Sequence, residues 1–447
     1  MTDGQKSCLN GDRISGLPDS LLHYILSFLP TKYAVRSSVL STKWRHLWTS
    51  IHNFDFVEGT FWSEDHSKDK FSDFVDRVLH ATDVSNIHKF VLEIWNSNVA
   101  NLNEWMSNIV RRKVQEINIT YVGYHPRSIP SCRWPSGCES LRILKLSELP
   151  CDIANLPSIC FPSLKVLHLV TIRFVRHLQS TTETDFSLSC PVLEDCMLYS
   201  CSWYRIKTVN INAPKLLKLK IFDEEVIASE DCEIKIHAES LISLEFRNKF
   251  VYDYSLHGLS SLIDVVIGFN LPIKDVHRVV SLFRWISNVR ALSFSSDCIE
   301  TLSLPAVLPH LQSLSCLTHL RVMRGWMKLI FRVFINILCN MPNIESLSFP
   351  NGLGRTFTFQ GQGRIIGTTP RWFLSNLKII EIKNFDWTQN QLWFVKFFLK
   401  SITSMDTLAV KINSCPTNAP LSRTKRVKEL QDLAKASNCV LQYTNVN

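Results

Sequence analysis

The chain has 447 residues, 45% of them hydrophobic and 20% charged, which suits two or three folded domains or one repeat array and excludes a disordered protein. Its net charge of +9 is mild over this length and does not favour nucleic-acid binding. The first residues lack the apolar core of a signal peptide, and no run reaches the ~18 apolar residues of a membrane span, so we expect no membrane partner. The 14 cysteines form no repeating framework. We therefore expect reduced thiols in the nucleus and/or the cytoplasm.

After a polar segment (1–11) that we expect to be disordered, residues 12–50 predict three short helices. Pro18 suits the first turn of one helix, and Pro30 ends it. Thr31 can cap the second helix, and Ser41 or Thr42 can cap the third. About forty residues cannot bury all the large apolar side chains of this segment against one another. The surplus apolar surface is expected to dock on the next domain or on a partner.

The pattern Leu17-Pro18-x-x-Leu21-x-x-x-Ile25-Leu26-Ser27-x-Leu29-Pro30, followed by Trp44-Arg45-x-Leu47-Trp48, resembles the F-box of plant proteins. The resemblance implies docking on a Skp-type adaptor, and through it on the cullin and RING subunits of a ubiquitin ligase. The alternative is an amphipathic helical cap on the next domain. The residues that would supply adaptor contact or the segment's own packing, between which the sequence does not decide, are Leu17, Pro18, Leu21, Ile25, Leu26, Leu29, Pro30, Val39, Trp44, Leu47 and Trp48.

Residues 51–350 alternate between strand and helix patterns and then settle into a repeat. Strands are predicted at 51–56, 88–95 and 114–119, and amphipathic helices at 71–79 and 101–110. From Ser140 onward the motif Ser/Pro-x-Leu-x-x-Leu-x-Leu/Phe recurs, with first steps of 23, 29, 23, 25 and 21 residues. These steps match a leucine-rich repeat, in which each unit gives one strand to a parallel sheet and buries its leucines by stacking on its neighbours.

Residues between the leucines are expected to project from the exposed, concave face of this solenoid. Such a face could hold a protein partner, although any one of these side chains can also be a merely solvated strand residue. The positions are Lys145, His168, Lys218, Lys220, Glu245, Ser293, Arg321 and Ser348.

The C-terminal part differs from the repeats. Residues 351–369 are Gly-rich and predict a loop, and 370–447 resemble the FBD region that ends many plant F-box/leucine-rich-repeat proteins. The resemblance rests on Ser375-Asn376-Leu377-Lys378-Ile379-Ile380-Glu381-Ile382-Lys383-Asn384-Phe385 and on the pattern around Phe398 and Leu441. Strands at 377–382 and 407–412 and helices at 391–401 and 423–436 are predicted, as an α+β cap on the end of the solenoid.

The sequence holds no motif of a common enzyme class. H-E-x-x-H, G-x-S-x-G and P-loop patterns are absent, and Gly361-x-Gly363 lacks the context of a phosphate loop. The clusters around Cys132 and Cys196 lack zinc-ligand spacing and predict small buried core residues. The basic run 423–428 predicts the solvated face of a helix. We therefore expect no catalytic residue, no metal and no cofactor.

Together these patterns predict an α/β chain with an F-box, an irregular leucine-rich-repeat solenoid and an FBD-like cap. The expected function is that of a non-catalytic substrate receptor in a cullin–RING ubiquitin ligase. The F-box would bind the adaptor, while Lys145, His168, Lys218, Lys220, Glu245 and Arg321 on the repeat face would bind an unknown protein substrate. The alternative is a repeat protein for protein interaction without a ligase role.

Overall fold

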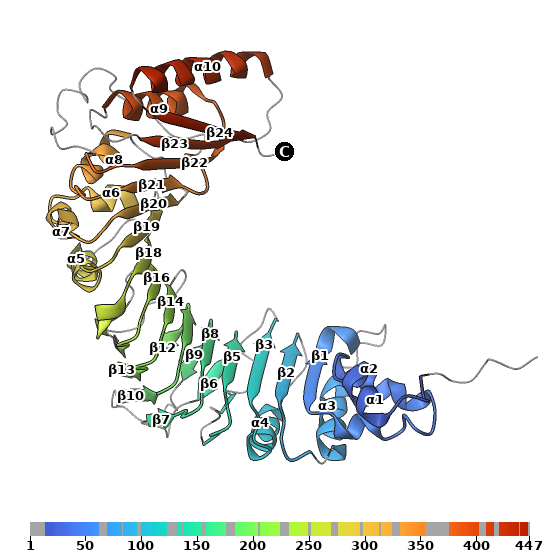
Figure 1. Cartoon of the computed structure of the whole chain (residues 1–447). Helices are drawn as coiled ribbons and strands as arrows, with labels where there is room; N and C mark the ends of the chain where they lie inside the picture. Colours follow the sequence, from blue (N-terminus) through green and yellow to red (C-terminus); the bar gives the residue numbers. More distant parts are fainter. Residues whose placement is uncertain are drawn as a thin grey trace, which may run out of the picture. The chain divides into compact units, whose positions relative to one another are not determined.

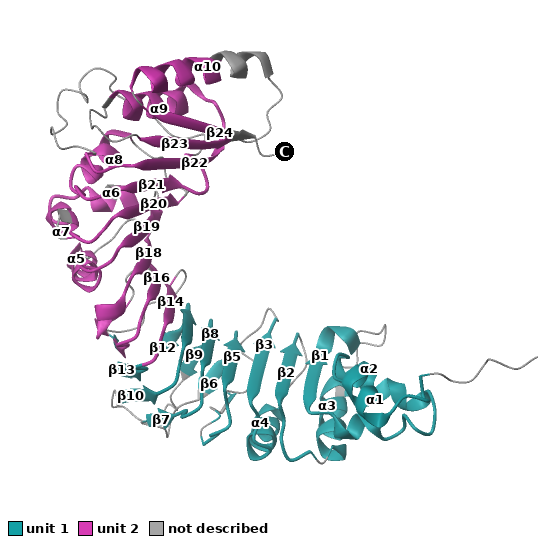
Figure 2. Cartoon of the chain, viewed as in Figure 1, with its two compact units in different colours: residues 1–214, 227–234 teal, residues 215–226, 235–447 magenta. Residues whose placement is uncertain are grey.

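The computed structural model forms two compact units, residues 1–214 with 227–234 and residues 215–226 with 235–447 (Figure 2). The residues that the structure describes are 14–61, 69–82, 84–95, 100–122, 132–133, 135, 137–152, 158–175, 184–203, 206–223, 232–248, 252–269, 276–295, 298–312, 314–323, 331–353, 375–401, 408–414, 420–437 and 439–445. The predicted disordered segment 1–11 lies outside these residues, as does most of the predicted Gly-rich loop, 354–369.

The first unit begins with four short helices: α1 (Asp19–Leu26), α2 (Thr31–Arg36), η1 (Ser37–Val39) and η2 (Leu47–Ser50). Pro18 and Pro30 occupy the N-cap positions of α1 and α2. The third predicted helix is present only in its second part, as η2, because residues 42–46 are turns that lead into it. This segment is tied instead to the preceding chain: the Trp44 indole N–H donates to Ser15 Oγ at 3.0 Å, and Lys43 Nζ donates to the Leu17 carbonyl at 2.6 Å.

A parallel sheet follows, whose strands lie in chain order (Figure 1). In the first unit they are β1 (Asn53–Val57), β2 (Lys89–Ile94), β3 (Glu116–Tyr121), β5 (Ile143–Ser147), β8 (Val166–Val170) and β11 (Asp195–Tyr199). The connections carry η3 (Glu58–Phe61), α3 (Asp69–Ala81) and α4 (Leu102–Arg111). Helices α3 and α4 match the two predicted helices, whereas no helix was predicted at η3.

The later connections of the first unit carry short strands in place of helices. One parallel row holds β4 (Cys132–Arg133), β6 (Pro150–Asp152), β9 (Arg173–Val175) and β12 (Ser202–Trp203). A second row holds β7 (Ser158–Cys160), β10 (Thr184–Ser189) and β13 (Ile206–Asn212). The sequence pattern predicted loops or helices at these places and did not indicate the two rows.

The second unit continues the same repeat. Its parallel strands are β14 (Lys218–Asp223), β16 (Ser243–Asn248), β18 (Asp264–Gly268), β19 (Ala291–Ser295), β20 (His319–Met323), β21 (Ser346–Phe349), β22 (Ile379–Phe385), β23 (Ala409–Ser414) and β24 (Val440–Asn445). The connections hold β15 (Glu233–His237), β17 (Asp253–His257), η5 (Leu259–Ser261), α5 (Val276–Trp285), α6 (Ile299–Leu302), α7 (Leu308–Gln312), α8 (Phe331–Leu338), α9 (Gln389–Ser401) and α10 (Pro420–Ala436).

The leucine-rich-repeat prediction is confirmed in its main feature, because the repeat motifs from Ser140 onward become parallel strands in consecutive register. Within β5 and β8 the leucines are buried and the residues between them are half-buried, which is the predicted alternation. The FBD-like segment continues the sheet, since β22 pairs in parallel with β21 and is followed by β23 and β24. Strand β24 was not predicted.

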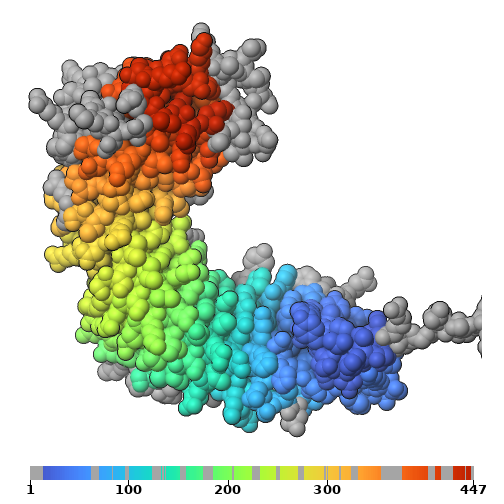
Figure 3. Space-filling view, in the orientation of Figure 1, coloured from blue at the N-terminus to red at the C-terminus, as the bar shows by residue number. Residues whose placement is uncertain are grey.

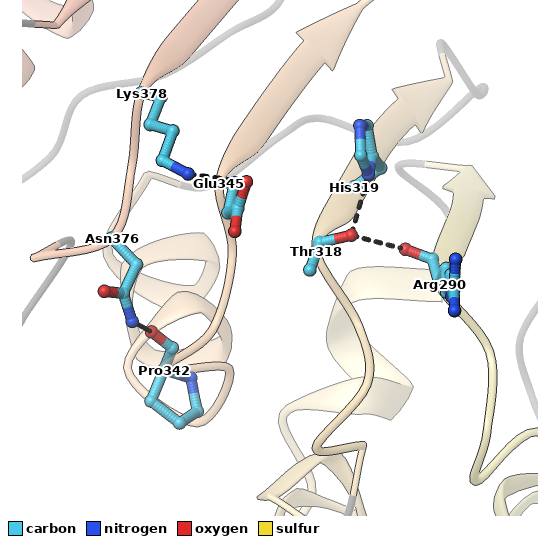
Figure 4. A network of polar contacts seen from close by, with 7 residues as sticks. All are labelled: Arg290, Thr318, His319, Pro342, Glu345, Asn376 and Lys378. Atoms are coloured by element: carbon cyan, nitrogen blue, oxygen red, sulfur yellow. Dashed lines mark hydrogen bonds and ion pairs between the residues drawn. The ribbon is translucent and has the colours of Figure 1, made fainter.

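A ladder of shared carbonyls joins the starts of neighbouring strands. At most of these strands, the carbonyl of the residue before the strand accepts the N–H groups of two successive residues of the next repeat. Thus the Thr318 N–H and the His319 N–H both donate to the Arg290 carbonyl at 3.0 Å, and Glu345 and Ser346 donate in turn to Thr318. Side chains reinforce this ladder in the second unit, where the Lys378 ammonium lies 3.0 Å from the Glu345 carboxylate and Asn376 Nδ2 donates to the Pro342 carbonyl (Figure 4).

The start of the sheet is closed by the N-terminal helices, as α2 packs against β1 (Figure 1). The fully buried Thr31 accepts the Asp55 N–H through Oγ1 at 2.7 Å, so it is a partner of the first strand and not the helix cap that we predicted. Lys32 Nζ donates to the Thr60 carbonyl and lies 4.3 Å from the centroid of the Phe61 ring. Burial, followed by the charge of Arg36, lowers the pKa of Lys32.

We predict that Thr31→Val lowers the free energy of unfolding by about 1–2 kcal/mol, because valine keeps the shape of threonine but leaves the Asp55 N–H without its acceptor. Urea unfolding of the two proteins measures the difference. Thr31→Ser keeps the hydroxyl and should lose less, so equal losses for the two variants would contradict the role of this hydrogen bond.

Candidate protein-docking surfaces

Helix α1 has two apolar faces with different environments. Leu22 and Leu26 are buried against the rest of the first unit. Leu21 and Ile25, each one residue earlier in the sequence, are 48% and 39% exposed. The adjacent Phe28 is 68% exposed, and its ring packs edge-on against Tyr24 with 4.8 Å between centroids. The helix therefore uses one face for packing and presents the other, partly aromatic face to solvent.

Other apolar residues of the N-terminal segment are exposed as well. Val39 is 84% exposed and Leu40 64%, at the end of η1, and Ile14, Leu29 and Tyr33 are also exposed. Exposed apolar side chains of this size are unusual when they gather within one short segment of a monomer. We define the N-terminal apolar surface by these side chains: Ile14, Leu21, Tyr24, Ile25, Phe28, Leu29, Tyr33, Val39 and Leu40. In the space-filling view this segment, in dark blue, forms the N-terminal end of the first unit (Figure 3).

The structure divides the predicted adaptor residues into three groups. Exposed are Pro18, Leu21, Ile25, Leu29 and Val39; half-buried are Leu17, Pro30 and Trp48; buried are Leu26, Trp44 and Leu47. The buried three pack the segment itself, which is one of the two roles that the sequence left open for them. The half-buried Trp48 donates its indole N–H to the Arg45 carbonyl of its own segment. Tyr24, Phe28, Tyr33 and Leu40 were missed by the sequence analysis, although an aromatic next to an apolar helix position could have signalled the first two.

The exposed face of the sheet carries the predicted substrate-binding residues of each unit. In the first unit Lys145 and His168 are register partners on β5 and β8. His168 Nε2 lies 3.3 Å from the Asp195 carboxylate at the start of β11. Both side chains are half-buried, so they do lie on the face as predicted, but His168 already has a neighbouring carboxylate.

In the second unit most of the predicted charges are paired across strands. The Glu245 carboxylate lies 3.5 Å from the Lys220 ammonium on the neighbouring strand and 2.8 Å from the guanidinium of Arg247 on its own strand. Arg321 on β20 reaches Asp264 on β18 at 3.0 Å, so its side chain crosses β19. This crossing explains why Ser293, the register partner of Arg321, is only 1% exposed and not on the solvated face as predicted. The exposed Lys218 has no ion-pair partner among the residues that the structure describes.

The buried cysteines have properties of core residues. Burial raises the pKa of Cys132 and Cys232 to about 12, and burial followed by the charge of Cys160 raises that of Cys190 to about 12.

The described part of the chain contains no group of three or more histidine, cysteine or acidic residues placed to hold a metal ion. Nor does a helix in that part have the length and apolarity needed to cross a membrane.

Comparison with known proteins identifies both ends of the chain. An F-box domain model matches residues 14–56, and an FBD model matches residues 367–407. An F-box/LRR-repeat protein of Arabidopsis thaliana is 27% identical over 463 residues, which cover 98% of this chain and 95% of that protein. An F-box/FBD/LRR-repeat protein of the same plant is 28% identical over 464 residues, covering 96% of each chain.

Substitutions should separate the two faces of α1 by their effect on stability. We expect Leu26→Ala to lower the free energy of unfolding by about 2–5 kcal/mol, because it opens a cavity in a packed core. Phe28→Ser should change it by less than about 0.5 kcal/mol, because the ring is already exposed to water. Chemical denaturation measures both values, and a large loss for Phe28→Ser would show that this ring packs within the chain.

Thiol reactivity should follow burial and pKa. At pH 8 the exposed Cys160 and Cys316 should react with maleimide within minutes, whereas Cys132, Cys190 and Cys232 should react only after unfolding, because the thiolate is the nucleophile and burial disfavours it. Peptide mass spectrometry after timed labelling identifies the modified residues. Fast labelling of Cys190 in the folded protein would contradict its placement in the core.

Proposed function

Because this chain is a plant-type F-box/FBD/leucine-rich-repeat protein, we propose that it is the substrate-recognition subunit of an SCF-type cullin–RING ubiquitin ligase. In this proposal the N-terminal apolar surface binds a Skp-type adaptor, which connects the chain to the cullin and RING subunits in the nucleus and/or the cytoplasm. The repeat face binds a protein substrate. The observation that supports the proposal most directly is the exposure of Leu21, Ile25 and Phe28 within the residues matched by the F-box model.

The shape of the exposed surface suits a permanent protein partner. Leu21, Tyr24, Ile25 and Phe28 recur at helical spacing, so they form one stripe along α1 and the turn after it. Aromatic and aliphatic anchors of this kind carry most of the binding energy in protein interfaces when a partner removes them from water. The opposite stripe, with Leu22 and Leu26, fixes the helix on the unit, so the exposed stripe is held in place before binding.

The proposed mechanism requires no bond chemistry by this chain. By holding the adaptor on one surface and the substrate on another, the protein would bring a substrate lysine close to a ubiquitin carrier bound elsewhere in the ligase. The gain is an increase in effective concentration and a restriction of orientation. The packing of α2 on β1, with the Thr31 hydrogen bond, links the adaptor-binding segment to the first strands of the solenoid.

A repeat protein that binds its partner without ligase activity is the second candidate, favoured by the regular sheet face with its paired charges. The two candidates differ in one observation. A ligase subunit recruits the adaptor together with the cullin and promotes ubiquitin transfer in a reconstituted reaction. A pure interaction module does not recruit a cullin, whether or not it binds the adaptor.

We predict that Leu21→Asp and Phe28→Asp each weaken binding to a Skp-type adaptor by at least about 30-fold, which corresponds to a hot spot of about 2 kcal/mol, because each places a charge in the apolar contact. Co-purification and titration calorimetry with the isolated adaptor measure the loss. Val440→Asp is the matched control, because Val440 is 45% exposed in the second unit.

The control variant should bind the adaptor as the wild type does, and all variants should keep the wild-type circular dichroism spectrum. Wild-type affinity of the Leu21→Asp and Phe28→Asp variants, or a stable wild-type monomer with no adaptor binding, would overturn the proposal.

A further inference from the structure

Three consecutive repeats of the second unit expose an aliphatic residue at the same place. Leu217, Ile242 and Ile263 each stand one residue before a strand and are 37%, 43% and 47% exposed. The shared-carbonyl ladder connects them directly, because the Ile242 N–H donates to the Leu217 carbonyl and the Ile263 N–H to the Ile242 carbonyl, both at 3.0 Å. We name these three residues the aliphatic ridge.

The ridge is not a general feature of the repeat. The residues that precede β5, β8, β11, β19, β20, β21 and β22 are charged or polar and are exposed or half-buried: Arg142, Lys165, Glu194, Arg290, Thr318, Glu345 and Lys378. The residues before β23 and β24, Leu408 and Cys439, are apolar but buried. Adjacent strands in a sheet are about 4.8 Å apart, so the three aliphatic side chains form one continuous strip. A strip of this kind costs solubility unless a partner covers it.

Basic side chains border the ridge without ion-pair partners. Lys215 and Lys218 flank Leu217, and Arg290 follows Ile263 on the ladder, its N–H donating to the Ile263 carbonyl at 3.1 Å. All three side chains are exposed, and none makes an ion pair with another described residue. Two acidic residues lie nearby in the sequence. The charge of Asp264 is paired with that of Arg321, and Glu239 is exposed in the turn before Ile242. The surroundings of the ridge are therefore net positive.

The spacing of the ridge selects the conformation of its partner. An α-helix laid across the strands presents an apolar side chain every turn, about 5.4 Å, which stays close to the strand spacing of about 4.8 Å over the two steps between the three residues. An extended peptide presents a side chain on the same face only every ~6.7 Å and leaves register after one step. A helix with apolar residues at i, i+3 or i+4 and i+7 fits the ridge.

We propose that the aliphatic ridge is the docking site for an amphipathic α-helix of a protein substrate, with acidic residues on both sides of its apolar stripe. Leu217, Ile242 and Ile263 bind the stripe, and Lys215, Lys218 and Arg290 select the acidic flanks. The identification of the partner as a substrate rests on the proposed function, whereas the binding of such a helix does not. Lys218, which the sequence analysis placed among the substrate-binding residues, takes part through its charge.

The test uses fluorescein-labelled peptides of about 18 residues, long enough to form a helix, and the full chain, measured both with and without its adaptor. One peptide carries leucines at helical spacing flanked by glutamates, a second carries lysines in place of the glutamates, and a third has a central proline that prevents the helix. Fluorescence anisotropy should show binding of the acidic helix at least about 10-fold tighter than binding of either other peptide.

Variants locate the binding to the ridge. Ile242→Ser should weaken binding of the acidic peptide at least about 10-fold, while Val440→Ser, at another exposed valine of the second unit, should leave it unchanged. The double variant Lys218→Glu with Arg290→Glu should bind the acidic peptide more weakly, and the lysine-flanked peptide more tightly, than the wild type does. Unchanged binding by Ile242→Ser, equal binding of the helical and proline peptides, or binding to anionic lipid vesicles in place of the peptide would overturn the proposal.

Leu21→Asp separates this proposal from the preceding one. If both hold, the variant loses the adaptor but binds the acidic peptide with wild-type affinity. Failure of the peptide to bind a wild-type chain that captures the adaptor would disprove only the ridge. Peptide binding by a wild-type chain that captures no adaptor would disprove only the ligase role.

Discussion

Every strand of this chain depends on the strand before it, because a parallel strand leaves half of its backbone groups without partners until the next repeat is added. The shared-carbonyl ladder meets part of that need at most strand starts, where one carbonyl accepts two N–H groups of the following repeat. The first strand has no earlier repeat, so Thr31 of α2 supplies an acceptor for the Asp55 N–H. The N-terminal helices are therefore part of the solenoid's packing as well as a separate surface.

The repeat could be predicted from sequence because its signal is local: buried leucines two residues apart, bounded by a serine, proline or asparagine, give a strand wherever they occur. The division of α1 could not be predicted in the same way. Leu21 and Leu22, like Ile25 and Leu26, are adjacent apolar residues, and helical periodicity allows either member of each pair to face the core. Only the packing of Leu22 and Leu26 on the unit decides which face remains exposed. The turns around Trp44 were missed for a related reason, since hydrogen bonds to Ser15 and Leu17 override the local helix signal.

Prediction from sequence is limited in the same way on the charged face of the sheet, where the interacting residues lie farther apart in the chain. Periodicity shows that Lys220, Glu245 and Arg321 lie between buried residues, and it places them on the face. It does not show that Lys220 pairs with Glu245 one strand away, or that Arg321 crosses a strand to reach Asp264. Those partners are separated by a whole repeat or more in sequence. Which charged side chains remain unpaired and available to a ligand therefore depends on the register between the strands. Lys218 keeps its charge unpaired among the described residues, whereas most of the other predicted ligand residues do not.

The two apolar surfaces differ in the kind of partner they suit. The N-terminal surface combines aromatic and aliphatic side chains with high exposure, which favours a partner that covers it for long periods. The aliphatic ridge is narrow and bordered by unpaired lysine and arginine, so its specificity would depend on charge as well as burial, and its affinity would fall with salt. The proposed role as a substrate receptor needs this difference, because the adaptor would have to stay bound while successive substrates are exchanged. The two surfaces share no residue and belong to different units, so each can change in sequence while the contacts that hold the other remain intact.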